Sequence, residues 1–200
     1  DPFRITKTQK WLSKQGNKQR ANTQPMSDKT AMIYATVDGH TQKICKKLQE
    51  VLRKHDQSVD LFNIEDFDED LSPYDRILLG ASIRYGVHDK KIIDLINTRQ
   101  GELESKRTAF FSVNLVARKP EKSSPETNPY VVKFFKKITW RPDVVETFAG
   151  MLEYPKYSFF DRTMIRLIMW MTKGPTDPKT VKEYTNWDKV EAFGERLSRL

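Results

Sequence analysis

The chain has 200 residues, of which 38 % are hydrophobic and 31 % charged, and a formal net charge of +8 at pH 7. A chain of this length forms one domain that buries roughly 70 % of its unfolded surface. Its apolar runs are far shorter than the ~20 residues that span a bilayer. The single cysteine, Cys45, excludes intrachain disulfides, and one cysteine with three scattered histidines lacks the spacing of a zinc site. We therefore expect no structural metal.

The beginning of the chain differs in composition from the rest. Residues 1–25 contain six basic side chains and one acidic side chain, so this stretch carries five of the eight net positive charges. We predict that residues 1–26 are a basic, disordered extension and that residues 27–200 form the domain. Two alternatives are a basic arm that binds nucleic acid or anionic lipid, and an origin of part of this stretch in an expression vector.

Short apolar segments alternate with helical patterns from Lys29 onward. Strands are predicted at Lys29–Ala35, Ser58–Phe62, Asp75–Ile83, Lys106–Val113 and Val144–Ala149. The spacing of apolar residues predicts a helix after the first strand, with Cys45 in its core face, another between the third and fourth strands, and a last one over Asn186–Leu200. This alternation predicts an α/β fold, a flavodoxin-like three-layer sandwich whose five parallel strands follow the order 2-1-3-4-5.

Ligands of such sheets bind at the carboxyl ends of the strands. The loop after the first strand combines hydroxyls, a glycine and a helix N-terminus, which predicts a cradle for a phosphate; its residues are Thr36, Val37, Asp38, Gly39, His40 and Thr41. An ordinary helix cap by Thr36 or Thr41 is the alternative. Glycines at the same edge, Gly39, Gly80 and Gly86, favour a ligand. The loop lacks the three glycines of a dinucleotide site, so we predict a mononucleotide.

Two further loops complete the predicted cofactor site. The loop after the third strand contains Ser82, Ile83, Arg84, Tyr85 and Gly86, and the loop after the fourth contains Ser112, Val113, Asn114 and Leu115. Tyr85 is suited to stack on a planar ligand, and Arg84 to stabilise negative charge on a reduced ring. The alternative for Tyr85 is an ordinary half-buried loop aromatic. We expect backbone amides of the later loop to close over the far side of the ring.

Four stretches carry a resemblance to a known family: Gly80–Gly86, Ser112–Lys122, Trp140–Asp143 and Asp161–Met169. With them, the chain from Lys29 to Leu200 resembles the flavodoxin-like, quinone-dependent protoporphyrinogen oxidases of bacterial haem biosynthesis. The resemblance implies FMN as cofactor and oxidation of protoporphyrinogen IX to protoporphyrin IX in three two-electron steps. It also implies menaquinone or ubiquinone as acceptor and a peripheral place on the cytoplasmic side of the bacterial inner membrane. Val37 departs from the family, which tends to have a basic residue there.

Few side chains can be assigned a catalytic or substrate-binding role from the sequence. The resemblance makes flavin N5 the hydride acceptor, and the sequence singles out no catalytic side chain. Arg84 and His88 are candidates, although we expect His88 to be an ordinary surface histidine. An insert at about residues 116–129 offers Arg118, Lys119 and Lys122 for the two propionates of the substrate. The alternative is a solvated basic loop.

A second insert, at about residues 154–174, contains a short apolar helix. We predict that it lies on a membrane surface, with Phe159, Phe160, Ile165, Ile168 and Trp170 facing lipid. The alternative is a helix that packs on the domain or forms a dimer contact.

Two other classes of function compete with this prediction. One is a flavodoxin-like electron carrier, or a quinone reductase with a different donor; the two inserts and the positive charge of the domain argue against a carrier. The other is a basic nucleic-acid module, which lacks a cluster of basic and aromatic residues outside the first 25 residues. We therefore expect no nucleic-acid partner, and a homo-oligomer is left open.

Overall fold

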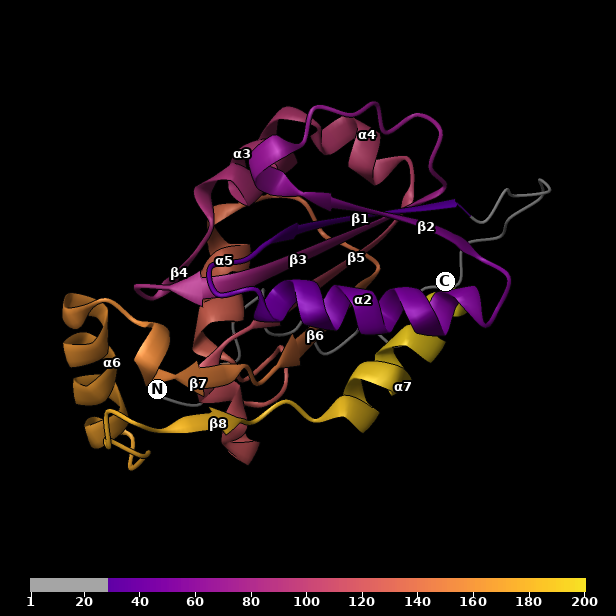
Figure 1. The fold of residues 1–200 in the computed structure, drawn as a ribbon. Helices are drawn as coiled ribbons and strands as arrows, with labels where there is room; N and C mark the ends of the chain where they lie inside the picture. Colours follow the sequence, from indigo (N-terminus) through magenta and orange to yellow (C-terminus); the bar gives the residue numbers. More distant parts are fainter. Residues whose placement is uncertain (1–28) are drawn as a thin grey trace.

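A parallel sheet with helices on both faces forms the body of the protein (Figure 1). The computed structural model describes residues 29–200, so the predicted basic extension lies outside the described residues. The parallel strands are β1 (Lys29–Ala35), β2 (Ser58–Asn63), β3 (Arg76–Arg84), β5 (Arg107–Val113) and β6 (Val144–Phe148). Their order is β2-β1-β3-β5-β6, which confirms the predicted flavodoxin-like order. The two-residue strand β4 (Val87–His88) adds an antiparallel pair to β3.

The side chains of the sheet alternate between two apolar cores. In β1, Ile33 packs into one core and Met32 into the other, and in β5 Phe110 and Phe111 divide in the same way. The helices α2 (His40–Arg53) and α7 (Trp187–Ser198) cover one face. The other face is covered by α3 (Lys90–Thr98), α4 (Gln100–Glu104) and α5 (Pro129–Lys137). The central strands β1, β3 and β5 are therefore buried on both sides over most of their length, as their apolar sequences predict, whereas the edge strand β2 is mostly half-buried.

The two predicted helices of one face form where the apolar spacing places them. Cys45 is fully buried on the inner side of α2, as predicted, and burial raises the pKa of its thiol. The last helix begins at Trp187 because the side chain of Asn186 accepts a hydrogen bond from the Lys189 amide at 3.0 Å.

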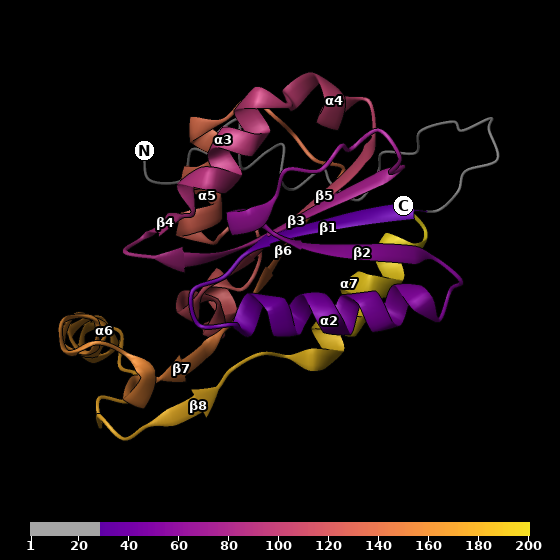
Figure 2. The ribbon, with the colours of Figure 1, turned by 45° about the horizontal axis from the view of Figure 1, so that its top comes forward.

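The helix predicted in the second insert is present as α6 (Phe159–Met171), whereas the other short elements in and beside the two inserts were not predicted. The first insert contains the 3-10 turns η3 (Leu115–Arg118) and η4 (Pro120–Lys122). In the second, β7 (Met151–Glu153) pairs antiparallel with β8 (Val181–Glu183), and η5 (Tyr154–Lys156) and α6 lie between them. α6 stands off from the sheet (Figure 2) and packs on a small third core that contains Leu152, Tyr154, Tyr157 and Met169.

Gly80 has a different role from the one expected. A Cβ atom at Gly80 would lie 2.3 Å from the ring of Phe111, whereas Gly80 does not line the ligand cavity described below. The glycine is required by the close approach of an aromatic ring on the neighbouring strand, not by a ligand.

Replacing Gly80 with Ala is expected to lower the free energy of unfolding by about 2 kcal/mol or more, because the ring of Phe111 has to move within a packed core. Denaturant titration of the two proteins measures the difference. Gly101→Ala is the control, because a Cβ atom there meets nothing within 4 Å, and a gain of up to about 1 kcal/mol is expected. Equal stability of Gly80→Ala and the parent protein would contradict this packing role.

Candidate functional site

A cavity of about 390 Å³ lies at the carboxyl ends of β1, β3 and β5, with α6 on its far side. Nearly all residues predicted for the cofactor site line it. They are Thr36, Val37, Asp38, Gly39, His40, Thr41, Ser82, Ile83, Arg84, Tyr85, Gly86, Val113, Asn114 and Leu115. Ser112 is the exception, since it is fully buried behind the wall. Three loops that are distant in the sequence therefore meet at one site.

The loop after β1 leads into α2, whose first turn is not capped by a side chain of the described residues. Gly39 directly precedes α2 with a φ of 82°. The Thr36 hydroxyl instead accepts a hydrogen bond from the Gly39 amide at 3.0 Å. Thr41 is fully buried, and its hydroxyl oxygen has no hydrogen-bond partner among the described residues. The helix-cap alternative is therefore wrong, and the free amides and the unpaired hydroxyl suit a bound anion.

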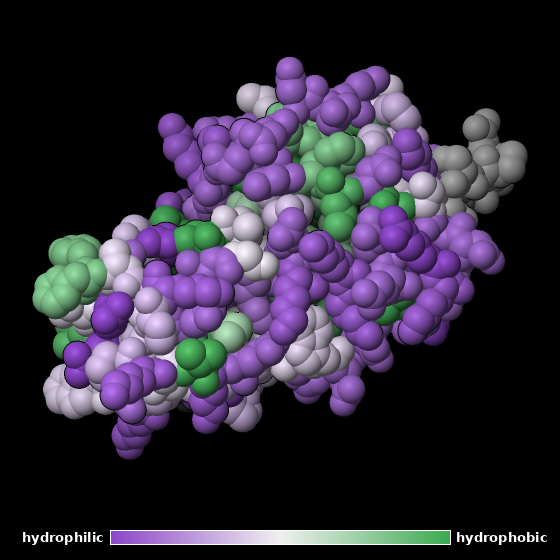
Figure 3. Space-filling view, viewed as in Figure 1, coloured by the Kyte–Doolittle hydropathy of each residue, from purple (hydrophilic) through white to green (hydrophobic). Residues whose placement is uncertain are grey.

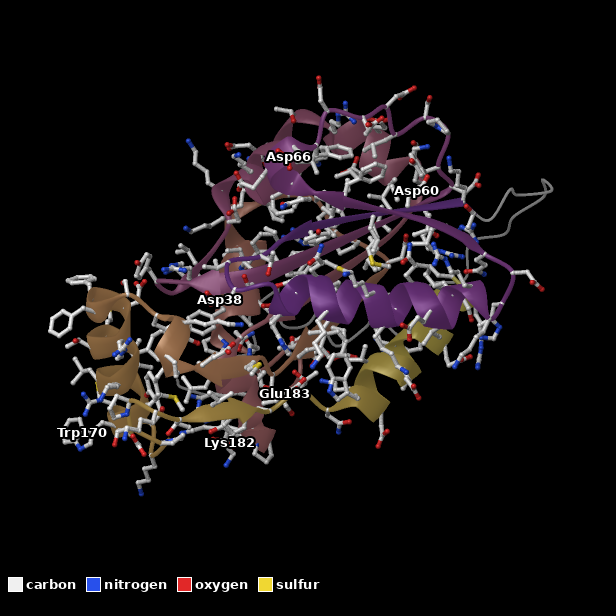
Figure 4. The ribbon with its side chains drawn as sticks, viewed as in Figure 1. Asp38, Asp60, Asp66, Trp170, Lys182 and Glu183 are labelled. Atoms are coloured by element: carbon white, nitrogen blue, oxygen red, sulfur yellow. The ribbon has the colours of Figure 1, made fainter. Side chains whose placement is uncertain are left out.

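Two titratable groups of this loop have shifted pKa values. Burial is the main cause of the lowered pKa of His40, so its imidazole is neutral at pH 7. The Thr185 hydroxyl donates to the Ala149 carbonyl at 2.8 Å, so its oxygen accepts from Nε2 of His40 at 2.6 Å. Burial also raises the pKa of Asp38, which lies at the sheet edge that faces α6, away from Asp60 and Asp66 (Figure 4). The predicted phosphate cradle thus contains the carboxyl of Asp38, whose negative charge would repel a bound phosphate.

The loop after β3 is bonded to α6 through Asp161. The Asp161 carboxylate accepts hydrogen bonds from Arg84 Nη2 at 2.5 Å, from the Tyr85 hydroxyl at 2.5 Å and from the Ser158 hydroxyl at 2.8 Å. These donors, that of Tyr85 first, lower the pKa of Asp161. Tyr85 has a φ of 50°, which is unusual for a residue with a side chain, and its ring is 61 % exposed. The network holds an exposed ring beside the cavity.

Asp161 was not among the residues predicted for the site. The available signal was the spacing of Ser158 and Asp161, because a Ser followed three residues later by an acidic residue marks a helix start. The Asp161 amide does donate to the Ser158 hydroxyl, at 3.2 Å. That pattern predicts the start of α6, whereas the partners Arg84 and Tyr85 come from a distant strand end.

His88 is buried, so its expected surface position is wrong. Burial lowers its pKa to about 3, and its ring packs edge-on against the rings of Phe110 and Phe134, which stack on each other. His88 Nε2 lies 2.8 Å from the Ser112 hydroxyl, which also accepts from the Asn114 amide at 3.1 Å. His88 does not line the cavity and reaches it only through these two residues. It has no place for direct contact with a substrate.

The basic residues of the first insert divide between two positions. Arg118 lines the cavity, and its guanidinium donates to the Leu115 carbonyl at 2.8 Å and to the Thr172 hydroxyl at 2.8 Å. It thereby joins the first insert to the end of α6. Lys119 and Lys122, the other two predicted carboxylate ligands, do not line the cavity in the structure.

α6 has an outer apolar face and an inner one. Phe159, Phe160 and Trp170 are 86 %, 71 % and 71 % exposed, and a hydrophobic patch lies at this end of the molecule next to hydrophilic residues (Figure 3). Ile165, which the sequence placed on the outer face, is half-buried and lines the cavity. Leu167 and Met171 are exposed in its stead. Among residues 29–200, none of the helices has the length and apolar character needed to cross a bilayer.

Comparison with known proteins agrees with this geometry. A family model described as a flavodoxin domain matches residues 31–179. A crystal structure of oxidised Flavodoxin 1 from Bacillus cereus has a TM-score of 0.51 and 17 % identity, and the match covers 86 % of this chain and 97 % of that one. The likeness shows the shared fold, and the domain implies that the cavity binds a flavin.

Two curated relatives are more similar in sequence. A protein of Escherichia coli K12 named protoporphyrinogen IX dehydrogenase (quinone) is 40 % identical over 173 residues, which are 86 % of this chain and 96 % of the relative. A protein of Leishmania major with the same name is 40 % identical over 176 residues, which are 87 % of this chain and 76 % of that relative. The chain therefore belongs to the flavodoxin domain family and, within it, to the family of the quinone-dependent protoporphyrinogen IX dehydrogenases.

Proposed function

We propose that the protein is an FMN-dependent enzyme of haem biosynthesis that oxidises protoporphyrinogen IX to protoporphyrin IX and passes the electrons to a membrane quinone. The observation that carries the proposal is the 40 % identity to the relatives of that name, which extends over 86 % of the chain and so includes both inserts. In the overall reaction, one protoporphyrinogen loses six electrons and six protons, and three quinones become three quinols.

The residues of the cavity fit FMN. A phosphate would take the free amides at the start of α2 and the unpaired hydroxyl of Thr41. Tyr85 offers an exposed ring for stacking, and Arg84 beside it offers positive charge. Bound FMN supplies two-electron chemistry at its ring. The protein's part is to hold the cofactor and the substrate in contact and to keep Tyr85 and Arg84 in place through Asp161.

A proton acceptor for the pyrrole nitrogens has to come from the cavity wall. The wall contains three carboxyls, of which Glu153 pairs with Lys156 at 2.8 Å and Asp161 has a lowered pKa. Asp38 has a raised pKa, and no side chain of the described residues is hydrogen-bonded to its carboxyl in the structure. Asp38 is therefore the carboxyl of the cavity wall whose pKa shift most favours the uptake of a proton.

The same proposal includes peripheral binding to the cytoplasmic side of the bacterial inner membrane through the outer face of α6. Phe159, Phe160 and Trp170 are largely exposed there, and Lys173 directly after the helix is exposed as well. Aromatic residues next to basic residues suit the boundary of an anionic lipid surface. A quinone with an isoprenoid tail stays in the bilayer, so its reductase has to reach that surface. Menaquinone and ubiquinone both meet this requirement.

The activity is tested by anaerobic assay of the FMN-loaded protein with protoporphyrinogen IX and a quinone. We expect fluorescent protoporphyrin to form with three quinones reduced for each porphyrin. An electron carrier would give flavin that reduces and reoxidises without porphyrin formation, and a quinone reductase with a different donor would consume quinone only with that donor. Either result would overturn the proposed substrate.

Thr41→Val is expected to change cofactor affinity and protein stability in opposite directions. Valine removes a buried hydroxyl that lacks a partner, so the free energy of unfolding without cofactor rises by about 1 kcal/mol. The same change removes a phosphate ligand, so the Kd for FMN rises roughly tenfold. Fluorescence titration measures the Kd, and riboflavin, which has no phosphate, is the control ligand. An equal loss of affinity for riboflavin would place Thr41 away from the phosphate.

Membrane binding is tested with the double variant Phe160→Asp/Trp170→Asp. Removing two exposed aromatic side chains is expected to lower binding to phosphatidylglycerol vesicles by about 3 kcal/mol, roughly a hundredfold. Co-sedimentation measures the bound fraction. Asn97→Asp is the control for added negative charge, since Asn97 is exposed on α3, on the main domain. Unchanged sedimentation of the double variant would favour a helix that has no contact with lipid.

A further inference from the structure

The inner face of α6 forms an apolar wall of the cavity. Met164, Ile165, Ile168 and Met169 line it from this helix, and Leu115 and Val116 line it from the first insert. Methionine side chains adapt to planar rings and make favourable contacts with them. This wall lies apart from the cradle at the start of α2, so the cavity has a polar part for an anion and an apolar part under α6.

The apolar part of the cavity is continuous with the outer surface of α6. Ile168 lines the cavity and is also 42 % exposed, so the same side chain belongs to the inner wall and to the apolar outer face. Ile168 therefore offers a ring that arrives from lipid an apolar contact both outside and inside the cavity.

The charges near this wall already have partners. The Arg84 guanidinium pairs with Asp161 at 2.5 Å, and Lys156 pairs with Glu153 at 2.8 Å. Arg118 donates to the Leu115 carbonyl and to the Thr172 hydroxyl. A neutral ring needs no counter-ion here, whereas a ligand with two carboxylates would have to break these contacts.

We propose that the apolar part of the cavity under α6 is the binding site for the ring of the quinone acceptor, and that the ring enters from lipid past Ile168. This inference rests on the proposed function, because it takes from it a quinone as acceptor. It adds which wall of the cavity holds that acceptor and where its entrance lies. The substrate with its two propionates then approaches the cavity from another side.

Direct labelling locates the bound ring. The FMN-loaded protein is irradiated with an azido-substituted benzoquinone and digested with trypsin, which cuts after Arg162, Arg166 and Lys173 and releases the inner face of α6 as two short peptides. We expect the label in the peptides 163–166 and 167–173, or in the peptide 108–118 that carries Leu115 and Val116, and we expect excess menadione to prevent it. Label confined to other peptides, or label in these peptides that menadione does not reduce, would overturn the proposal.

Kinetics test the entrance without the porphyrinogen. The FMN-loaded protein is reduced with dithionite, and its reoxidation by water-soluble menadione is followed by stopped flow. Ile168→Trp narrows the entrance and is expected to lower the second-order rate constant about tenfold. Thr163→Trp, on the exposed side of α6, is the matched control.

The outcomes separate this inference from the proposed function. Equal rates for Ile168→Trp and Thr163→Trp would overturn the entrance past Ile168. A protein that takes up no FMN would instead contradict the proposed cofactor. Normal labelling of α6 without porphyrin formation would contradict only the proposed substrate. Vesicles are absent from the stopped-flow experiment, so loss of membrane binding does not enter the result.

Discussion

The Asp161 carboxylate connects the cofactor loop to the second insert. It is 7 % exposed and accepts hydrogen bonds from Arg84 and Tyr85 at the end of β3 and from Ser158 at the start of its own helix. Charge-assisted hydrogen bonds of this kind are stronger than neutral ones. Because α6 packs on a small core of its own, this ionic contact and the hydrogen bond from Arg118 to Thr172 set where the helix stands over the cavity. The shape of the cavity therefore depends on these two contacts.

On the opposite side of the cavity, at the start of α2, polar groups lack hydrogen-bond partners among the described residues. α2 begins without a capping side chain, and the buried hydroxyl of Thr41 has no partner in the structure. Both features lower the stability of the protein alone, since unpaired polar groups at a helix start or in the interior are costly. A bound phosphate would satisfy both. The site is thus stabilised by its ligand, whereas the sheet and its two cores are stable through apolar packing.

The sequence was sufficient for the parts of the fold that repeat a simple pattern. All five parallel strands and their order followed from buried apolar runs that alternate with helical spacing. Strands β7 and β8 have only three residues each, so they carry no periodic signal and exist because they pair with each other. α5 was not predicted, although Asn128 followed by Pro129 is a helix-start signal that can be read in the sequence.

Within the site, the sequence indicated the loops but not the directions of their side chains. The three loops meet as parallel strand ends require. Whether His88 faces solvent or Phe110, and whether Ile165 faces lipid or the cavity, depends on tertiary packing that one sequence does not specify. The partnership of Asp161 with Arg84 joins residues 77 positions apart. Such contacts depend on where the second insert lies in the fold, and the alternation of strands and helices in the sequence does not indicate that position.

The buried position of Cys45 has a consequence for a protein that handles quinones. Quinones are electrophiles that add to thiolates, and only the thiolate form of a cysteine is nucleophilic. Cys45 is the single cysteine of the chain, its side chain is fully enclosed between α2 and the sheet, and burial raises its pKa. The chain therefore presents no exposed thiol that a quinone could arylate during repeated turnover.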